Sequence, residues 1–338
     1  MSHPIHDELE DDYVPIPEPQ SFIDLQRENP TNQQLGGLIG LLCGDAVGVP
    51  YEFHPAEEIP EKSLIDMVPP PAPFRRSHRQ VPVGTWSDDG AQALCICTCI
   101  NHDSKLDIHD FAQRLCDWYE DGYLAVDNKV FDVGIQTSEA IDRLLNGTDP
   151  HKSGNADEMS NGNGSLMRVL PLALYMSRTD DALVHDAHLQ SLPTHAHPRS
   201  LVACAYYCLV ARAYLEGNEA PWDDAVTRLT RVYTSWHITE ERSIFLNELA
   251  LILDSPLREQ PKGSGYVVDT LWSAKKAMEE SSYEAVIQAA IAFGNDTDTT
   301  ACVAGGLAGI RFGFSGIPSR WLMQLRGFDI LQPYLINF

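Results

Sequence analysis

The sequence predicts an all-helical protein. Apolar residues recur at the i, i+3, i+4 spacing of an amphipathic helix in the segments 89–101, 109–120, 133–145, 198–216, 239–253, 267–279 and 281–293. Alternating Val, Ile and Thr runs bounded by turn residues are nearly absent, which argues against a substantial sheet. Gly, Pro, Asn and Asp cluster at 54–84, 146–165 and 256–266, which is the composition of loops between helices.

The composition narrows the class of protein. A chain of 338 residues with 43% hydrophobic residues can form one large helical domain or two smaller ones. A net charge of −24 repels phosphate backbones, so we expect no nucleic-acid partner. The apolar stretch 35–49 is interrupted by Gly and Asp and is too short to span a membrane. The acidic N-terminus has no apolar segment typical of a secretory signal, and we therefore expect a cytoplasmic protein.

The eight cysteines do not form a disulfide pattern. Cys95, Cys97 and Cys99 lie in an apolar run, and Cys204 and Cys208 share one face of a predicted helix. None belongs to a C-x-x-C pair with matching ligands downstream. Buried free thiols in a reducing compartment are the simpler interpretation.

Residues 1–34 differ in composition from the rest. They contain eight acidic residues, one Arg and five Pro, so they have little to bury and cannot continue a helix. We predict an extended N-terminal arm over 1–34 and a helical domain over 35–338. The arm is either a merely solvated tail or a segment that docks on a partner.

The first acidic cluster is Ser87-Asp88-Asp89, which lies directly before the apolar helical stretch 91–100. Capping of the helix by Ser87 or Asp88 is the simplest role for such a cluster. Adjacent carboxylates repel each other, and a helix N-terminus relieves only part of that repulsion.

The second acidic cluster contains Asp296, Asp298 and Thr299, directly before the small-residue helical stretch 301–313. Capping explains one of these aspartates but not both. Carboxylates and a hydroxyl are hard ligands that suit Mg²⁺, Mn²⁺ or Ca²⁺. Together the two clusters supply four negative charges, which two divalent cations would balance. Nothing in the sequence itself shows that the clusters meet.

Five motifs, in this order, resemble those of the ADP-ribosylglycohydrolase family. They are Gly40-Leu-Leu-Cys-Gly-Asp-Ala-Val-Gly-Val-Pro-Tyr-Glu-Phe53, Gly84-Thr-Trp-Ser-Asp-Asp89, Asn161-Gly-Asn-Gly-Ser-Leu-Met-Arg168, Thr194-His-Ala-His-Pro198 and Gly294-Asn-Asp-Thr-Asp-Thr299. The resemblance covers residues 36 to about 315. It implies a compact orthogonal bundle of helices around a dinuclear site for two Mg²⁺ or Mn²⁺ ions.

The resemblance also implies the ligands of these ions. They would be Ser87, Asp88, Asp89, Asp296, Asp298 and Thr299. The chain departs from the family pattern at Ser87, at Gly90 and at Asn295, where the family more often has Thr, Thr and Gly. Ser87 still offers a hydroxyl ligand.

Further residues acquire roles from the same resemblance. The loop Asn161, Gly162, Asn163, Gly164 and Ser165, followed by a helix predicted from Leu166, resembles a cradle for the diphosphate of ADP-ribose. His195 would contact ADP-ribose, although a structural histidine is an equal alternative. Arg168 would add positive charge or pair with an aspartate.

Two carboxylates are candidates for the general base. Glu52 stands where the family has a glutamate beside the metals; the alternative is a solvent-facing residue at a helix end. Asp132 matches an aspartate of the arginine-directed branch, typified by the dinitrogenase reductase-activating glycohydrolase, although Ile135 replaces an expected asparagine. A loop-capping aspartate is the alternative for Asp132.

The resemblance implies a metal-dependent hydrolase that cleaves the N-glycosidic bond between ADP-ribose and a protein side chain, with arginine as the expected linkage. Asp132 or Glu52 would deprotonate the water that attacks the ribose. Two other functions fit the sequence. One is an inhibitory immunity protein that blocks an ADP-ribosyltransferase toxin through its N-terminal arm, and the other is a phosphohydrolase acting on a free nucleotide.

Overall fold

A computed structural model of the chain describes residues 20–70, 72–100, 105–174 and 179–337. Within these ranges the protein is helical, with only isolated β-bridges, which confirms the predicted class. The α-helices are α1 (Phe22–Glu28), α2 (Gln33–Gly48), α3 (Asp88–Cys99), α4 (Ile108–Asp121), α5 (Ile135–Leu145), α6 (Leu170–Leu174), α7 (Asp180–Ser191), α8 (Pro198–Leu215), α9 (Pro221–Ser235), α10 (Thr239–Leu253), α11 (Val267–Ala277), α12 (Tyr283–Ile291), α13 (Thr297–Phe312), α14 (Ser319–Leu322) and α15 (Phe328–Leu331).

Each of the seven segments predicted from apolar spacing overlaps one helix over most of its length, namely α3, α4, α5, α8, α10, α11 and α12, although several helices are shorter by one to four residues. Helices α7 and α9 were not predicted from the sequence. Helix α7 begins after Thr179, whose hydroxyl accepts a hydrogen bond from Ala182 N at 3.2 Å, and α9 begins with Pro221. Short 3₁₀ helices complete the described chain at η1 (Val49–Tyr51), η2 (Ala56–Glu58), η3 (Lys62–Leu64), η4 (Val126–Asn128), η5 (Pro256–Arg258), η6 (Phe314–Gly316) and η7 (Gln332–Asn337).

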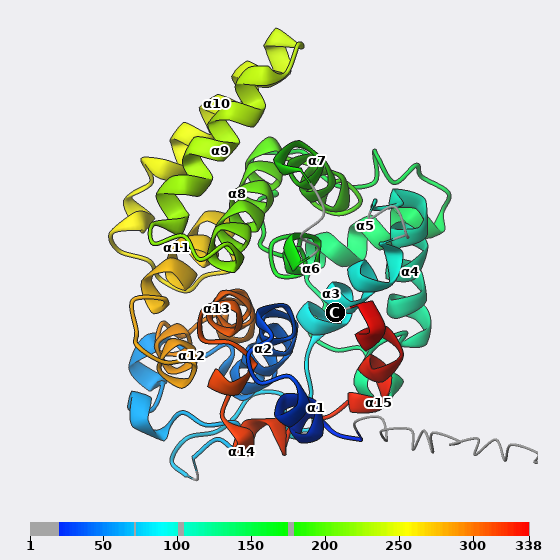
Figure 1. The fold of residues 1–338 in the computed structure, drawn as a ribbon. Helices are drawn as coiled ribbons and strands as arrows, with labels where there is room; N and C mark the ends of the chain where they lie inside the picture. Colours follow the sequence, from blue (N-terminus) through cyan, green and yellow to red (C-terminus); the bar gives the residue numbers. More distant parts are fainter. Residues whose placement is uncertain (1–19, 71, 101–104, 175–178, 338) are drawn as a thin grey trace, which may run out of the picture.

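Helices α2 and α13 lie against each other in the middle of the fold (Figure 1). Their contact, which we call the glycine seam, is built from Gly36, Gly40, Gly44 and Gly48 of α2 and the small residues facing them on α13. A Cβ atom at Gly40 would lie 2.5 Å from the carbonyl oxygen of Gly305, and one at Gly48 would lie 2.4 Å from the Cα of Asp298. Only glycine lets the two backbones approach this closely, so the spacing of four residues fixes the register of α2 on α13.

The other helices surround this pair. Helix α13 also contacts α8, α11 and α12, while α3 and α6 pack against α2. Helix α8 is buried along almost its whole length and connects this centre to α7, α9 and α10. Figure 1 shows α9 and α10 side by side, extending away from the rest of the molecule.

The start of the helical domain differs from the sequence prediction. Helix α1 lies inside the predicted arm, and its Phe22 and Leu25 are buried. Gln26 Nε2 donates hydrogen bonds to the carbonyl oxygens of Phe314 at 2.7 Å and Ile317 at 3.0 Å. The extended arm predicted over 1–34 is therefore wrong for residues 20–34, which pack on the domain, and its first part, residues 1–19, lies outside the described residues.

Two other features bear on the sequence predictions. All eight cysteines are buried and free, as expected. Within the described chain, we find no helix that combines the length and the apolar character needed to cross a bilayer.

Candidate active site

The N-terminal ends of α3 and α13 bring the two acidic clusters together. Asp88 and Asp89 form the first turn of α3, while Asp298 and Thr299 lie in the first turn of α13. The Thr299 hydroxyl is 3.3 Å from Asp89 Oδ1, and both side chains are buried. Asp296 occupies the position directly before α13. The structure therefore assembles all six predicted ligand residues around the starts of two helices.

Asp45 holds the start of α3 in place, and the sequence analysis gave it no role. Its carboxylate lies on α2 with no exposed surface and accepts hydrogen bonds from the backbone N–H groups of Ser87 at 3.0 Å and Gly90 at 2.9 Å. Burial raises the pKa of Asp45 to about 7. A single carboxylate within the apolar stretch 35–49 was the signal, because a buried charge requires such partners.

A pair of backbone hydrogen bonds joins the Glu52 segment to the Asp296 segment. Phe53 N donates to Asn295 O at 2.7 Å, and Asn295 N donates to His54 O at 2.6 Å. Phe53 and Asn295 both adopt positive φ angles, of 62° and 61°. Such angles are unfavourable for residues other than glycine, so the paired hydrogen bonds must hold this geometry. Glu52 is thereby placed next to the acidic cluster and is buried, not solvent-facing as the alternative interpretation had it.

His78 joins Glu52 and Asp132 at the edge of the cluster. Its Nε2 atom is 2.6 Å from Glu52 Oε2 and 3.7 Å from Asp132 Oδ1. The His78 ring contacts the rings of both Phe53 and Phe131, with centroid distances of 5.6 Å and 5.2 Å. The sequence analysis missed His78 because it lies in a segment recognised only as a loop.

The electrostatics of the cluster fit a site for cations. Burial is the main cause that raises the pKa of Asp88, Asp89 and Asp298 well above the ordinary range, and neighbouring carboxylates add to it. The same two effects raise the pKa of Glu52 to about 11. Asp89 Oδ2 and Asp298 Oδ2 are buried, and neither has a hydrogen-bond partner among the described residues. Buried carboxylate oxygens without donors are suited to bind divalent cations.

Two groups of side chains have their ligand atoms close enough to share an ion. One is Glu52, Asp296 and Asp298, and the other is Glu52, His78 and Asp132; in each group the atoms lie within 4.8 Å of one another. Glu52 belongs to both groups. The oxygen-rich set suits Mg²⁺ or Mn²⁺ better than Zn²⁺, which prefers Cys and His.

The glycine loop at 161–165 lies beside this cluster. Asn163 Nδ2 donates a hydrogen bond to Asp296 Oδ2 at 2.8 Å. Asn161 and Ser165 instead direct their side chains into the protein: Asn161 Oδ1 accepts from Ser200 Oγ at 3.0 Å, and Ser165 Oγ accepts from Ser191 Oγ at 2.8 Å. The loop therefore offers a ligand mainly its backbone and its glycines.

The helix predicted from Leu166 begins later. Residues 164–168 form turns, in which Leu166 N and Met167 N both donate to Asn163 O, and α6 starts only at Leu170. The prediction of a helix N-terminus at the end of the glycine loop is thus wrong. The physical reason is that Arg168 forms buried hydrogen bonds with Gln92, Gln190 and Thr194, which compete with a regular helix at this position.

Arg168 lies at the centre of a buried polar network. Its guanidinium donates to Gln92 Oε1 at 2.7 Å, to Gln190 Oε1 at 2.9 Å and to Thr194 Oγ1 at 2.7 Å. Gln92 Nε2 in turn donates to Asp88 Oδ2 at 3.2 Å. Arg168 is therefore linked to the acidic cluster through Gln92, and among the described residues it forms no ion pair with an aspartate.

The His195 ring packs against the glycine loop at Gly162 and Gly164. A Cβ atom at Gly164 would lie 2.8 Å from His195 Cε1, and one at Gly162 would lie 3.4 Å from His195 Nε2. Burial lowers the pKa of His195 to about 3, so the ring is neutral. Its Nδ1 lies 2.8 Å from Thr194 Oγ1, which connects it to the Arg168 network. His195 thus sets the position of the loop whose glycines it touches.

A cavity of about 550 Å³ opens next to the glycine loop, and its lining includes Gln136, Gly162, Arg199, Gly265 and Tyr266. A Cβ atom at Gly265 would lie 3.2 Å from Asp296 Oδ2, which places this cavity against the acidic cluster.

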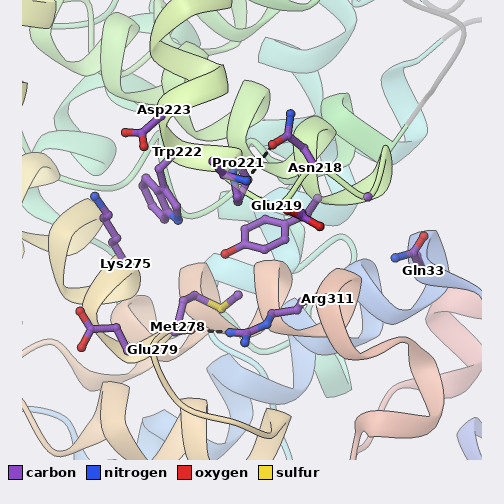
Figure 2. A pocket seen from close by; sticks show the side chains of 13 residues that line it. Gln33, Asn218, Glu219, Pro221, Trp222, Asp223, Lys275, Met278, Glu279 and Arg311 are labelled. Carbon is purple, nitrogen blue, oxygen red and sulfur yellow. Dashed lines mark hydrogen bonds between the residues drawn. The ribbon is translucent and has the colours of Figure 1, made fainter.

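A second cavity, of about 670 Å³, lies between the start of α9 and the ends of α11 and α13 and is lined by Trp222, Lys275 and Arg311 (Figure 2). It contains none of the predicted site residues.

Comparisons with known proteins agree with this geometry. A family model described as ADP-ribosylglycohydrolase matches residues 26–336. An ADP-ribosylarginine hydrolase, Tri1, of Pseudomonas putida (strain GB-1) is 32% identical over 303 residues, which cover 89% of this chain and 76% of the relative. An ADP-ribosyl-[dinitrogen reductase] glycohydrolase of Rhodospirillum rubrum is 27% identical over 314 residues, covering 87% of this chain and 90% of the relative. A solved structure titled ADP-ribosylglycohydrolase-related protein complex has a TM-score of 0.70 and 27% identity, covering 92% of this chain and 98% of that one.

Proposed function

Because the chain belongs to the ADP-ribosylglycohydrolase family and is a hydrolase of ADP-ribose glycosidic bonds, we propose that it releases ADP-ribose from arginine side chains of modified proteins. The proposal rests on one observation: the two buried acidic clusters meet beside Asp132 and the glycine loop. Two of their carboxylate oxygens, on Asp89 and Asp298, accept no hydrogen bond from the described residues. The two Tri1 relatives support arginine as the linkage, since both are named ADP-ribosylarginine hydrolases.

We assign two Mg²⁺ or Mn²⁺ ions to the cluster, held by Ser87, Asp88, Asp89, Asp296, Asp298 and Thr299 with Glu52 beside them. Bound there, the ions would neutralise the buried carboxylates and offer binding positions for the ribose hydroxyls and a water. The remaining chemistry belongs to the side chains of the chain itself.

Asp132 is the general base in this proposal. Glu52 belongs to both groups of candidate ligands, whereas Asp132 belongs to one, and Glu52 Oε2 already lies 2.6 Å from His78 Nε2. Asp132 lies on the same edge with part of its side chain exposed, where it can accept a proton from the attacking water. The water oxygen bonds to the ribose C1 as its proton passes to Asp132, and the N-glycosidic bond breaks with its electron pair remaining on the guanidine nitrogen. The leaving guanidine then takes up the proton from Asp132. Carboxylates near C1 stabilise the oxocarbenium-like transition state.

Binding of ADP-ribose would use the glycine loop and the adjoining cavity. Gly162 and Gly164 leave no side chain between the backbone and a ligand, and Asn163 is fixed by Asp296 and by Thr270 at 2.9 Å. His195 acts in this proposal as a support for the loop. A loop held from both sides presents its N–H groups to a diphosphate without having to reorganise.

A direct experiment tests the proposal. Peptides that carry ADP-ribose on one arginine or one serine are incubated with the protein and Mg²⁺ or Mn²⁺, and the products are identified by mass. Intact ADP-ribose and unmodified arginine peptide are expected, and Asp296→Ala serves as the inactive control. Release of AMP or phosphate would instead indicate the phosphohydrolase that the sequence also allowed.

We also propose that residues 1–19 form an acidic arm that binds an ADP-ribosyltransferase toxin, so that a cytoplasmic immunity role accompanies hydrolysis. This segment holds six acidic residues, four prolines and no Lys or Arg, a composition suited to a basic cleft. Deletion of residues 1–19 tests it, since α1 then remains intact. Binding to the cognate transferase should fall while hydrolysis is unchanged; unchanged binding would reject the role.

A further inference from the structure

The segment Arg75-Arg-Ser-His-Arg79, which we call the basic loop, is unusual in this acidic chain. Three of the 24 Lys and Arg residues lie within these five positions, in a protein with a net charge of −24. Arg75 and Arg79 are exposed. Arg76 donates through Nη2 to the carbonyl oxygens of Arg79 at 2.7 Å and Val81 at 2.9 Å. Within the described part of the chain, none of the three arginines forms an ion pair with a carboxylate.

The basic loop is anchored at the edge of the candidate active site. Ser77 N donates to Pro50 O at 2.8 Å, and Ser77 Oγ donates to Glu52 O at 2.5 Å. His54 Nε2 lies 2.9 Å from Arg75 O. The loop also supplies His78 to the group that contains Glu52 and Asp132. These bonds hold the backbone of the loop, so Arg75 and Arg79 lie within three residues of His78, whose Nε2 is 3.7 Å from Oδ1 of the proposed general base Asp132.

The surroundings of the basic loop are those of a surface that receives a polypeptide. Phe53, directly after Glu52, is 68% exposed although its ring lies against His78. A cavity of about 710 Å³ with a largely apolar lining opens beside Arg75 and includes His54 and Phe74. Exposed aromatic surface next to unpaired arginines is typical of interaction sites.

We propose that the basic loop binds carboxylates of the substrate protein next to the ADP-ribosylated residue, so that the enzyme prefers modified sites flanked by Asp or Glu. This inference rests on the proposed function, and it adds the class of sequence that the site accepts. A guanidinium binds a carboxylate through two parallel hydrogen bonds, which also orients the peptide. Electrostatic attraction between exposed charges is largely screened beyond about 8 Å at physiological salt. The basic loop can therefore attract an acidic segment of the substrate although the rest of the enzyme is acidic.

Three peptides of equal length test the proposal. Each carries one ADP-ribosylated arginine, with Glu, Ser or Lys on both sides of it. Two exposed ion pairs should favour the Glu peptide over the Ser peptide by about two- to thirtyfold in kcat/KM. In Arg75→Ser/Arg79→Ser this preference should disappear through a higher KM, with kcat on the Ser peptide unchanged. Raising the salt to 0.5 M should reduce the preference in the wild type and have little effect in the variant.

A matched control removes the same charge elsewhere. Arg231→Ser/Arg242→Ser lies on the α9–α10 pair, which extends away from the site in Figure 1, and it should keep the wild-type preference. Calorimetric binding of free ADP-ribose and of Mn²⁺ should be the same in the wild type and in Arg75→Ser/Arg79→Ser. Weaker binding of either by the variant would show that the loop serves the ligand or the cations, and it would overturn the proposal.

The remaining outcomes separate the two proposals. Equal kcat/KM on the three peptides in the wild type would overturn the docking role while leaving hydrolysis intact. Failure to hydrolyse any peptide would reject the proposed function instead. The unmodified Glu and Ser peptides then test docking by affinity alone: tighter binding of the Glu peptide supports it, and equal binding overturns it.

Discussion

Replacing Gly44 by alanine tests whether the close approach of α2 and α13 holds the site together. A Cβ atom at Gly44 would lie 2.1 Å from the carbonyl oxygen of Ala301, whereas ordinary contacts of this kind lie at 3.4 Å or more. The obstacle is backbone, so the helices would have to separate by roughly 1 Å. Overpacking of this kind lowers the free energy of unfolding by about 1–3 kcal/mol, and the better helix propensity of alanine raises it by about 1 kcal/mol. Because no flexible side chain can move aside, we expect a net loss near 2 kcal/mol.

Gly37→Ala is the matched control on the same helix. Its Cβ atom would meet side-chain ends, Ile310 Cγ1 at 2.8 Å and Leu174 Cδ2 at 3.0 Å, which can move aside. We expect Gly37→Ala to stay within about 1 kcal/mol of the wild type in guanidinium unfolding, since the propensity gain offsets the adjustment. Activity should separate the pair further, because a shift of about 1 Å at a catalytic site lowers rates by about 100-fold. Equal stability and equal activity of the two variants would refute the role of the glycine seam.

Four other perturbations have defined outcomes. Asp45→Ala leaves two buried N–H groups without an acceptor and should lower the free energy of unfolding by about 2–6 kcal/mol, measured by denaturant titration; a change under 0.5 kcal/mol would contradict this. Asp296→Ala should abolish hydrolysis and weaken Mn²⁺ binding in calorimetry, and EDTA should inactivate the wild type until Mg²⁺ or Mn²⁺ is restored. Asp132→Ala should lower kcat on arginine-linked peptide by more than 100-fold with ADP-ribose affinity within about threefold, because a base acts mainly in the transition state; a parallel loss of affinity would make it a binding residue. Without cations, the melting temperature should fall as pH rises from about 4 to 7: the pKa of Asp45 is about 7 in the folded protein against about 3.9 unfolded, so the folded state holds protons that the unfolded state has released. Added Mg²⁺ should reverse that slope, and a flat profile in EDTA would count against the buried cluster.

The helical class and most helix positions follow from apolar periodicity, because the buried face of an amphipathic helix consists of apolar residues at helical spacing in its own sequence. The acidic clusters were visible for a similar reason, since two aspartates at one helix start exceed what capping requires. Their meeting was not visible. It depends on the glycine spacing of α2, whose meaning appears only when the residues of α13 that face it are known.

Asp45 and His78 show what local patterns leave out. Asp45 acts through backbone N–H groups that follow it by more than 40 residues, and His78 becomes part of the site only because its loop is tied to Pro50 and Glu52. The helix predicted from Leu166 failed for the same kind of reason. Arg168 forms buried hydrogen bonds to α3 and to the segment 190–194, and these distant partners influence the local backbone.

The arrangement also connects cation binding to folding. Folding brings together carboxylates from α3, from α13 and from the segment after α2, and it removes them from water. Burial and the neighbouring carboxylates raise the pKa of Asp88 and Asp298, because their charged forms are unfavourable in this cluster without a counter-charge. A ligand that binds only the folded state stabilises it in proportion to its affinity and concentration. Cations at this site would therefore act both in the reaction and as the link between three segments that are distant in sequence.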